Sequence, residues 1–132
     1  MHAGAVEEQR VLEEKLDKAL DEASSKVRYA LDATVKPSTE LEMSIRFAAE
    51  AVEYSSALFS LTYGLEDVDP EVKVDKKTDP AILVRDSAEF LRKAREVRAR
   101  SPVEAYTEIR KAADYLKTAY LSQAKKSLTK RS

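Results

Sequence analysis

Helix-breaking residues are few in this chain, and they fall at only a few places. The 132 residues include two glycines and four prolines. Gly64, Pro70 and Pro80 belong to one stretch, whereas Pro37 and Pro102 each stand alone. Because glycine and proline interrupt helices, the rest of the chain is divided into long stretches free of breakers. This pattern favours an all-α fold.

Four of these stretches place apolar residues at the three- and four-residue spacing of one helix face. Local signals mark their starts: Thr39 with Glu42 forms a capping box, and prolines follow the capping residues Asp79 and Ser101. The predicted helices cover residues of about 5–35, 40–63, 80–99 and 102–128.

The connections between these helices predict how they are arranged. The first and last are short, so each joins its two helices into a hairpin. Residues 65–79 form a longer polar loop between the hairpins. The sequence therefore predicts one domain, residues 1–132, folded as an antiparallel four-helix bundle made of two helical hairpins joined by a long polar loop.

Composition sets the expected environment. There is no cysteine, no uninterrupted apolar run exceeds four residues, and the first residues lack the pattern of a secretory signal. We therefore expect a cytoplasmic protein without a membrane span. Asparagine is absent, glutamine occurs only at 9 and 123, and charged residues make up 36% of the chain. Since side-chain amides degrade at high temperature, this composition favours a thermophilic origin.

Catalytic residue sets are missing from the sequence. His2 is the only histidine, so neither a histidine-based metal site nor an activated serine nucleophile can be assembled. Acidic pairs such as Glu13–Glu14 and Glu50–Glu53 lie on the polar sides of their predicted helices. We expect no metal, no cofactor, no small-molecule substrate and no enzymatic activity.

Charge is distributed unevenly along the chain. Residues 1–80 contain 18 acidic and 10 basic side chains, whereas residues 81–132 contain 6 acidic and 13 basic ones. Such asymmetry favours contact with a polyanion or with a complementary protein surface. The candidate phosphate-binding residues on the third and fourth helices are Arg85, Arg92, Lys93, Arg95, Arg98, Arg100, Arg110, Lys111 and Lys117. Interleaved acids leave a different interpretation open, in which these cations form ion pairs on the protein's own surface.

The second predicted helix carries more apolar surface than a simple bundle requires. One stripe can fill the core, and a second stripe runs beside it with the spacing of a coiled-coil seam. This second stripe consists of Met43, Phe47, Tyr54, Leu58 and Leu61. It predicts self-association, with a symmetric dimer favoured. Two alternatives remain: the helix is central in the bundle, or the long loop covers the stripe.

The sequence thus favours a non-catalytic helical interaction or assembly module, a self-associating small subunit or accessory protein. The alternative is an accessory protein that binds nucleic acid non-specifically through the phosphates, using the basic residues of the third and fourth helices.

Overall fold

The computed structural model describes residues 3–35 and 40–131. Four helices account for most of them: α1 (Ala3–Thr34), α2 (Leu41–Tyr63), α3 (Pro80–Val97) and α4 (Pro102–Arg131). No strand occurs among these described residues, so the all-α prediction is confirmed. α3 ends two residues earlier than predicted and α4 continues three residues further.

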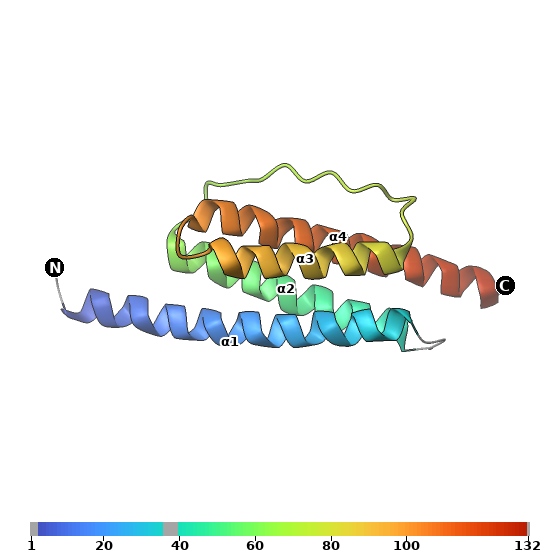
Figure 1. The fold of residues 1–132 in the computed structure, drawn as a ribbon, viewed down its shortest axis with the longest axis horizontal. Coiled ribbons are helices and arrows are strands. Elements are labelled where there is room, and N and C mark those ends of the chain that lie inside the picture. The colour runs from blue at the N-terminus through green and yellow to red at the C-terminus, as the bar shows by residue number, and fades with distance from the viewer. Residues whose placement is uncertain (1–2, 36–39, 132) are drawn as a thin grey trace.

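The helices form a closed ring of neighbours. α1 packs against α2 and α3, and α4 packs against the same two helices, so α1 and α4 occupy opposite corners. In Figure 1 the chain runs along α1, returns along α2, and passes over α4 through the long loop before entering α3. The first turns of α1 and the last turns of α4 extend beyond the other helices at opposite ends (Figure 1).

Helix ends follow from local chemistry. Gly64 closes α2 in the left-handed conformation, with φ of 64°, and the N–H of Leu65 donates to the Ser60 carbonyl at 2.9 Å. The Asp79 carboxylate accepts from the N–H of Ala81 at 2.9 Å, one residue after Pro80 begins α3. Ser101 Oγ accepts from the N–H of Glu104 at 3.2 Å at the start of α4. The predicted cap Thr39 lies outside the described residues.

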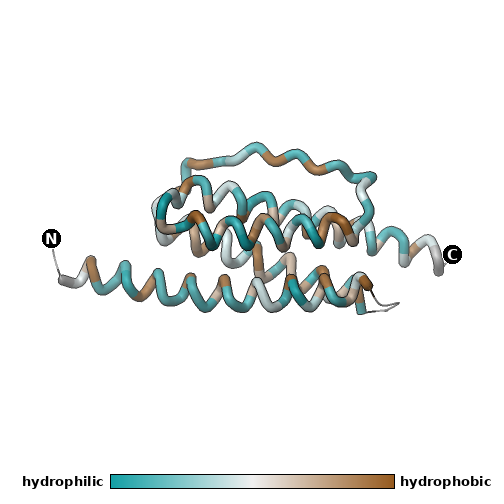
Figure 2. The backbone as a smooth tube through the Cα atoms, viewed as in Figure 1, coloured by the Kyte–Doolittle hydropathy of each residue, from teal (hydrophilic) through white to brown (hydrophobic). Residues whose placement is uncertain are grey.

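The core is built from one stripe of each helix, and its members are aliphatic except for one ring. Figure 2 shows isolated hydrophobic positions along an otherwise hydrophilic α1, as expected for a helix that buries a single face. Phe59 of α2 is fully buried, with its ring centroid 4.8 Å from that of Tyr63 and 6.2 Å from that of Tyr106. The largest fully buried aliphatic side chains are Leu16, Leu20, Ile45, Leu83, Leu91, Ile109 and Leu116.

The loop of residues 64–79 contributes to the core at several points. Leu65 is buried, and Val68 and Val74 pack against the core cluster. Residues 71–75 alternate between exposed and half-buried, with Val72 and Val74 on the inner side. The loop therefore lies against the helices rather than extending freely into solvent.

Candidate interaction surfaces

The two sides of α2 differ sharply in exposure. Its inner stripe, including Ile45, Val52 and Phe59, is fully buried. We call the second stripe the α2 outer stripe; its members are Met43, Phe47, Tyr54, Leu58 and Leu61. Four of these five side chains are exposed, Phe47 to 49% and Tyr54 to 57%, and Leu58 is half-buried. The bundle itself thus leaves this stripe largely uncovered.

Neither alternative covering applies to the α2 outer stripe within the described residues. Phe47 and Tyr54 line a groove between α1 and α2, together with Ala19 and Ala51. The long loop instead passes over α4 (Figure 1). α2 also packs against α1 and α4, but these contacts leave four of the five side chains of the stripe exposed.

Charged side chains border the α1–α2 groove. Lys26 Nζ lies 5.9 Å from the centroid of the Phe47 ring and 3.2 Å from the Glu22 carboxylate. Arg46 on α2 pairs with Glu50 at 3.1 Å. Lys15 and Lys18 also line the groove, and neither forms an ion pair with any described residue. An apolar centre with a polar rim is the composition found in protein–protein interfaces.

Small polar residues on α2 were not recognised from the sequence as part of the core. Ser44, Ser55, Ser56 and Thr62 are all buried. Ser55 Oγ donates to the Ala51 carbonyl at 3.0 Å and Thr62 Oγ1 to the Leu58 carbonyl at 2.7 Å, so their hydroxyls are satisfied within the helix. Their small size lets neighbouring helices approach closely. The only sequence signal for their burial is that they lie three or four residues from apolar residues of the core stripe.

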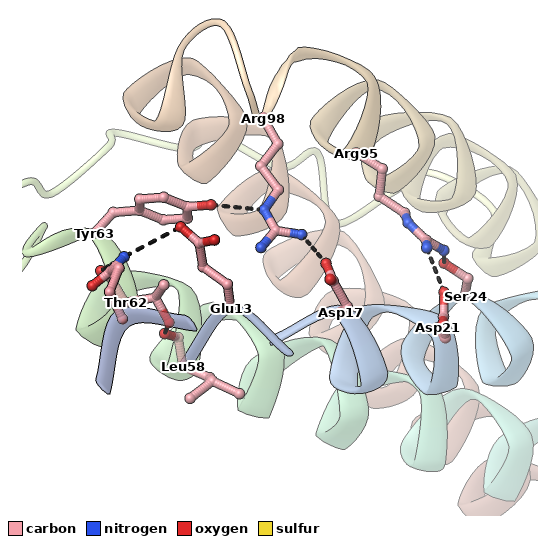
Figure 3. Close-up of polar contacts among 10 residues, drawn as sticks. Glu13, Asp17, Asp21, Ser24, Leu58, Thr62, Tyr63, Arg95 and Arg98 are labelled. Carbon is pink, nitrogen blue, oxygen red and sulfur yellow. Dashed lines mark hydrogen bonds and ion pairs between the residues drawn. The ribbon is translucent and has the colours of Figure 1, made fainter. Parts of the chain in front are cut away.

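The predicted basic residues lie on α3, α4 and the turn between them, and two of them bind α1. Arg98 pairs with Asp17 and donates from Nε to Tyr63 Oη at 2.8 Å (Figure 3). Arg95 pairs with Asp21 and donates to Ser24 Oγ at 3.0 Å (Figure 3). The Arg98 side chain is only 17% exposed, so it is part of the α1–α3 contact rather than of a free surface.

Arg110 connects α4 to α2 in a similar way. Its Nη1 lies 2.8 Å from the Glu53 carboxylate and 3.1 Å from Ser56 Oγ, while Nη2 lies 3.2 Å from Asp114. The planar guanidinium can make these contacts together because its donors form a fixed fork.

A buried carboxylate engages two more of the basic residues. Glu108 is only 4% exposed, and its Oε1 lies 3.3 Å from Lys111 Nζ and 3.6 Å from Lys93 Nζ. Lys111 Nζ also lies 5.6 Å from the centroid of the Phe90 ring. The sequence did not single out Glu108, because its residue type does not distinguish it from the exposed Glu104 and the half-buried Asp114 of the same helix.

The remaining basic residues are paired along α3 or carry no partner. Arg92 Nε donates to Glu89 at 2.9 Å and Nη1 to Glu96 at 2.9 Å. The hydrogen bond from Arg92 to Glu89 and the positive charge of Arg92 lower the pKa of Glu89 below its ordinary value. Arg85 lies 3.8 Å from Asp86. Among the described residues, only Arg100 and Lys117 of the predicted set have no carboxylate partner.

Part of the charge asymmetry is therefore complementary within the molecule. Basic side chains of α3, α4 and the turn between them pair with acidic side chains of α1 and α2, as Arg95, Arg98 and Arg110 show. The acids considered as metal ligands also have polar partners: Glu53 binds Arg110, and Glu13 accepts from Gln9 at 3.4 Å. In the described part of the chain, no group of three or more potential ligand side chains could hold a metal ion.

No protein-family model matches the chain, and comparison with curated proteins and with solved structures finds no significantly similar protein. None of the described helices combines the length and apolar character needed to cross a bilayer.

Proposed function

We propose that this protein is a non-catalytic helical assembly module that self-associates through the α2 outer stripe. The observation that carries the proposal is the exposure of Met43, Phe47, Tyr54 and Leu61 side by side on one helix. A contiguous patch of large apolar side chains in water promotes association, and a symmetric dimer is the commonest way to cover it.

The proposal includes the finer architecture: an antiparallel bundle of two helical hairpins that presents α2 at one corner. The ring of helix neighbours and the small number of residues between α1 and α2 and between α3 and α4 support this arrangement. We also propose a cytoplasmic protein of thermophilic origin, which is supported by the absence of cysteine and asparagine and by several ion pairs between helices.

Sedimentation velocity tests the self-association directly. We expect the wild type to sediment as a dimer and the Phe47→Glu/Leu61→Glu variant as a monomer with unchanged helicity by circular dichroism. The matched control is Val103→Glu/Leu121→Glu, which adds the same charge at exposed apolar positions of α4 and should remain dimeric. A wild type that stays monomeric at high concentration would refute the proposal.

Leu58→Glu in combination with Phe47→Glu gives a second test. Leu58 is half-buried, so this variant reports whether that part of the stripe belongs to the interface or to the monomer. A folded monomer is the result expected for an interface. Unfolding of the chain would place the side chain in the core and contradict its assignment to the α2 outer stripe.

The alternative function, phosphate binding through the basic residues, has less support. Seven of the nine predicted residues lie within 4.0 Å of carboxylates of the same chain. These pairs would have to open before the cations could neutralise phosphates. Binding to arbitrary DNA or RNA that weakens steeply with salt, and weakens uniformly in an Arg92→Gln/Lys93→Gln/Arg95→Gln variant, would favour this alternative over the assembly module.

A further inference from the structure

We infer that the self-associated form is an antiparallel dimer in which α2 of one copy crosses α2 of a second copy about a two-fold axis near Val52 and Glu53. This inference rests on the proposed self-association and adds to it the direction and register of the two chains. It follows from the order of side chains along the α2 outer stripe, from the groove beside it and from the charges on α1.

The apolar positions of the exposed side of α2 have nearly the same spacing in both directions. They are Met43, Phe47, Ala51, Tyr54, Leu58 and Leu61, separated by three or four residues throughout. An antiparallel partner centred on the middle of this series therefore brings like positions together. Met43 then lies opposite the partner's Leu61, and Phe47 opposite the partner's Leu58.

The sizes of the central side chains favour this direction over a parallel one. In the antiparallel register, Tyr54 lies opposite the partner's Ala51, so a large exposed side chain meets a small one. Ala51 and Ala19 both line the α1–α2 groove and leave room there for a ring. A parallel two-fold pairs each residue with its own copy, so tyrosine meets tyrosine and alanine meets alanine, which packs poorly.

The charges of α1 are arranged consistently with the same axis. The register of α1 against α2 is fixed at one end by Gln9 Nε2, 3.1 Å from the Thr62 carbonyl, and at the other by Lys26 over Phe47. Between these contacts, Lys18 and Glu22 line the groove one helical turn apart.

The proposed two-fold axis is perpendicular to the two α2 helices, so α1 lies on the same side of the α2–α2 contact in both copies. α1 of one copy is then antiparallel to α1 of the other, and Lys18 faces the partner's Glu22. Lys18 forms no ion pair with any described residue, so this pairing supplies a counter-charge that the single chain does not.

Cysteine cross-linking tests the direction and register, because the chain has no cysteine of its own. Two single variants are prepared, Phe47→Cys and Leu58→Cys, one of them with an affinity tag. Each is confirmed as folded and dimeric by circular dichroism and sedimentation. They are then oxidised alone and as a mixture, and disulfide-linked species are measured on non-reducing gels.

We expect the linked dimer in the mixture and not in either variant alone. In the antiparallel register, two copies of position 47 are offset by eleven residues, about 16 Å along the helix, which is beyond disulfide reach. A second pair, Met43→Cys with Leu61→Cys, uses exposed positions only and should behave in the same way. A mixture of Val103→Cys and Leu58→Cys is the matched control and should not link.

The outcomes separate the two proposals. Linking of each variant with itself would establish a parallel pairing and overturn the antiparallel register while leaving self-association intact. A mixture that sediments as a dimer but does not link would likewise overturn the register alone. Chains that remain monomeric throughout would overturn the register together with the proposed function.

Discussion

Replacing Phe59 and Phe47 by alanine compares the same chemical change on the two sides of one helix. Phe59 is fully buried and its ring packs between Tyr63 and Tyr106. Truncation removes the transfer free energy of the ring and leaves a cavity, so we expect Phe59→Ala to lower the free energy of unfolding by about 3–5 kcal/mol. This is a large part of the roughly 5–15 kcal/mol that stabilises a domain.

Phe47→Ala should behave differently. Its side chain is 49% exposed, so truncation forfeits only part of the apolar burial and opens no enclosed cavity. We expect a loss of about 1 kcal/mol, measured at a protein concentration at which the chain is monomeric. Urea unfolding followed by far-ultraviolet circular dichroism gives both values from transition midpoints and slopes.

The comparison also has a clear contradicting result. Equal losses for Phe59→Ala and Phe47→Ala in the monomer would mean that the bundle buries both stripes of α2. The distinction between core side and interface side would then be wrong. If the loss of stability in Phe47→Ala increased with protein concentration, and that in Phe59→Ala did not, the increase would instead reflect the effect of dimerisation on apparent stability.

Three further changes probe individual contacts. Gly64→Ala should lower the free energy of unfolding by about 1 kcal/mol, because φ is positive at this residue. A steric clash does not contribute, since a Cβ atom there would meet nothing within 4 Å. No loss of stability would show that the C-terminal end of α2 can change its conformation freely. The pKa of Glu89 is lowered chiefly by the hydrogen bond from Arg92. The stabilisation that this bond gives the folded chain is therefore complete above the ordinary pKa of a glutamate, and it is lost as the pH falls through the lower pKa of Glu89 in the folded state. Carboxyl NMR titration should show this lowering disappear in Arg92→Gln. Arg110→Met should cost about 1 kcal/mol, and a double-mutant cycle with Glu53→Gln should assign roughly half of it to that pair, since Glu53 is largely exposed.

Helix number and helix starts were accessible from the sequence because their determinants are local. Pro80 and Pro102 follow residues whose side chains cap the helices in the structure, and Gly64 adopts the left-handed conformation that ends α2. These signals depend on neighbours within a few positions. The two apolar stripes of α2 were also visible, since both follow from helical periodicity.

The partners of side chains were not accessible in the same way. The positions of α1 and α4 decide which of the two apolar stripes of α2 is buried in the core. Both stripes are hydrophobic, so hydrophobicity alone does not predict which one is buried. Arg98 pairs with Asp17, which is distant in sequence. The sequence shows that acidic and basic residues are present, but it does not show which of them pair. Glu108 contacts Lys93 of α3 and Ser56 contacts Arg110 of α4, so these partners could not be inferred from the segment around either residue.

The long loop over α4 has a consequence for the rate at which the chain folds. α1 can pack against α2, and α3 against α4, through contacts near in sequence, which form quickly. The loop then keeps the acidic α1–α2 pair and the basic α3–α4 pair at a high effective concentration. Their docking is therefore an intramolecular encounter between opposite charges. Electrostatic attraction of this kind accelerates encounter and is screened by salt. Refolding should therefore slow as ionic strength rises, even where the packing of the finished core is unchanged.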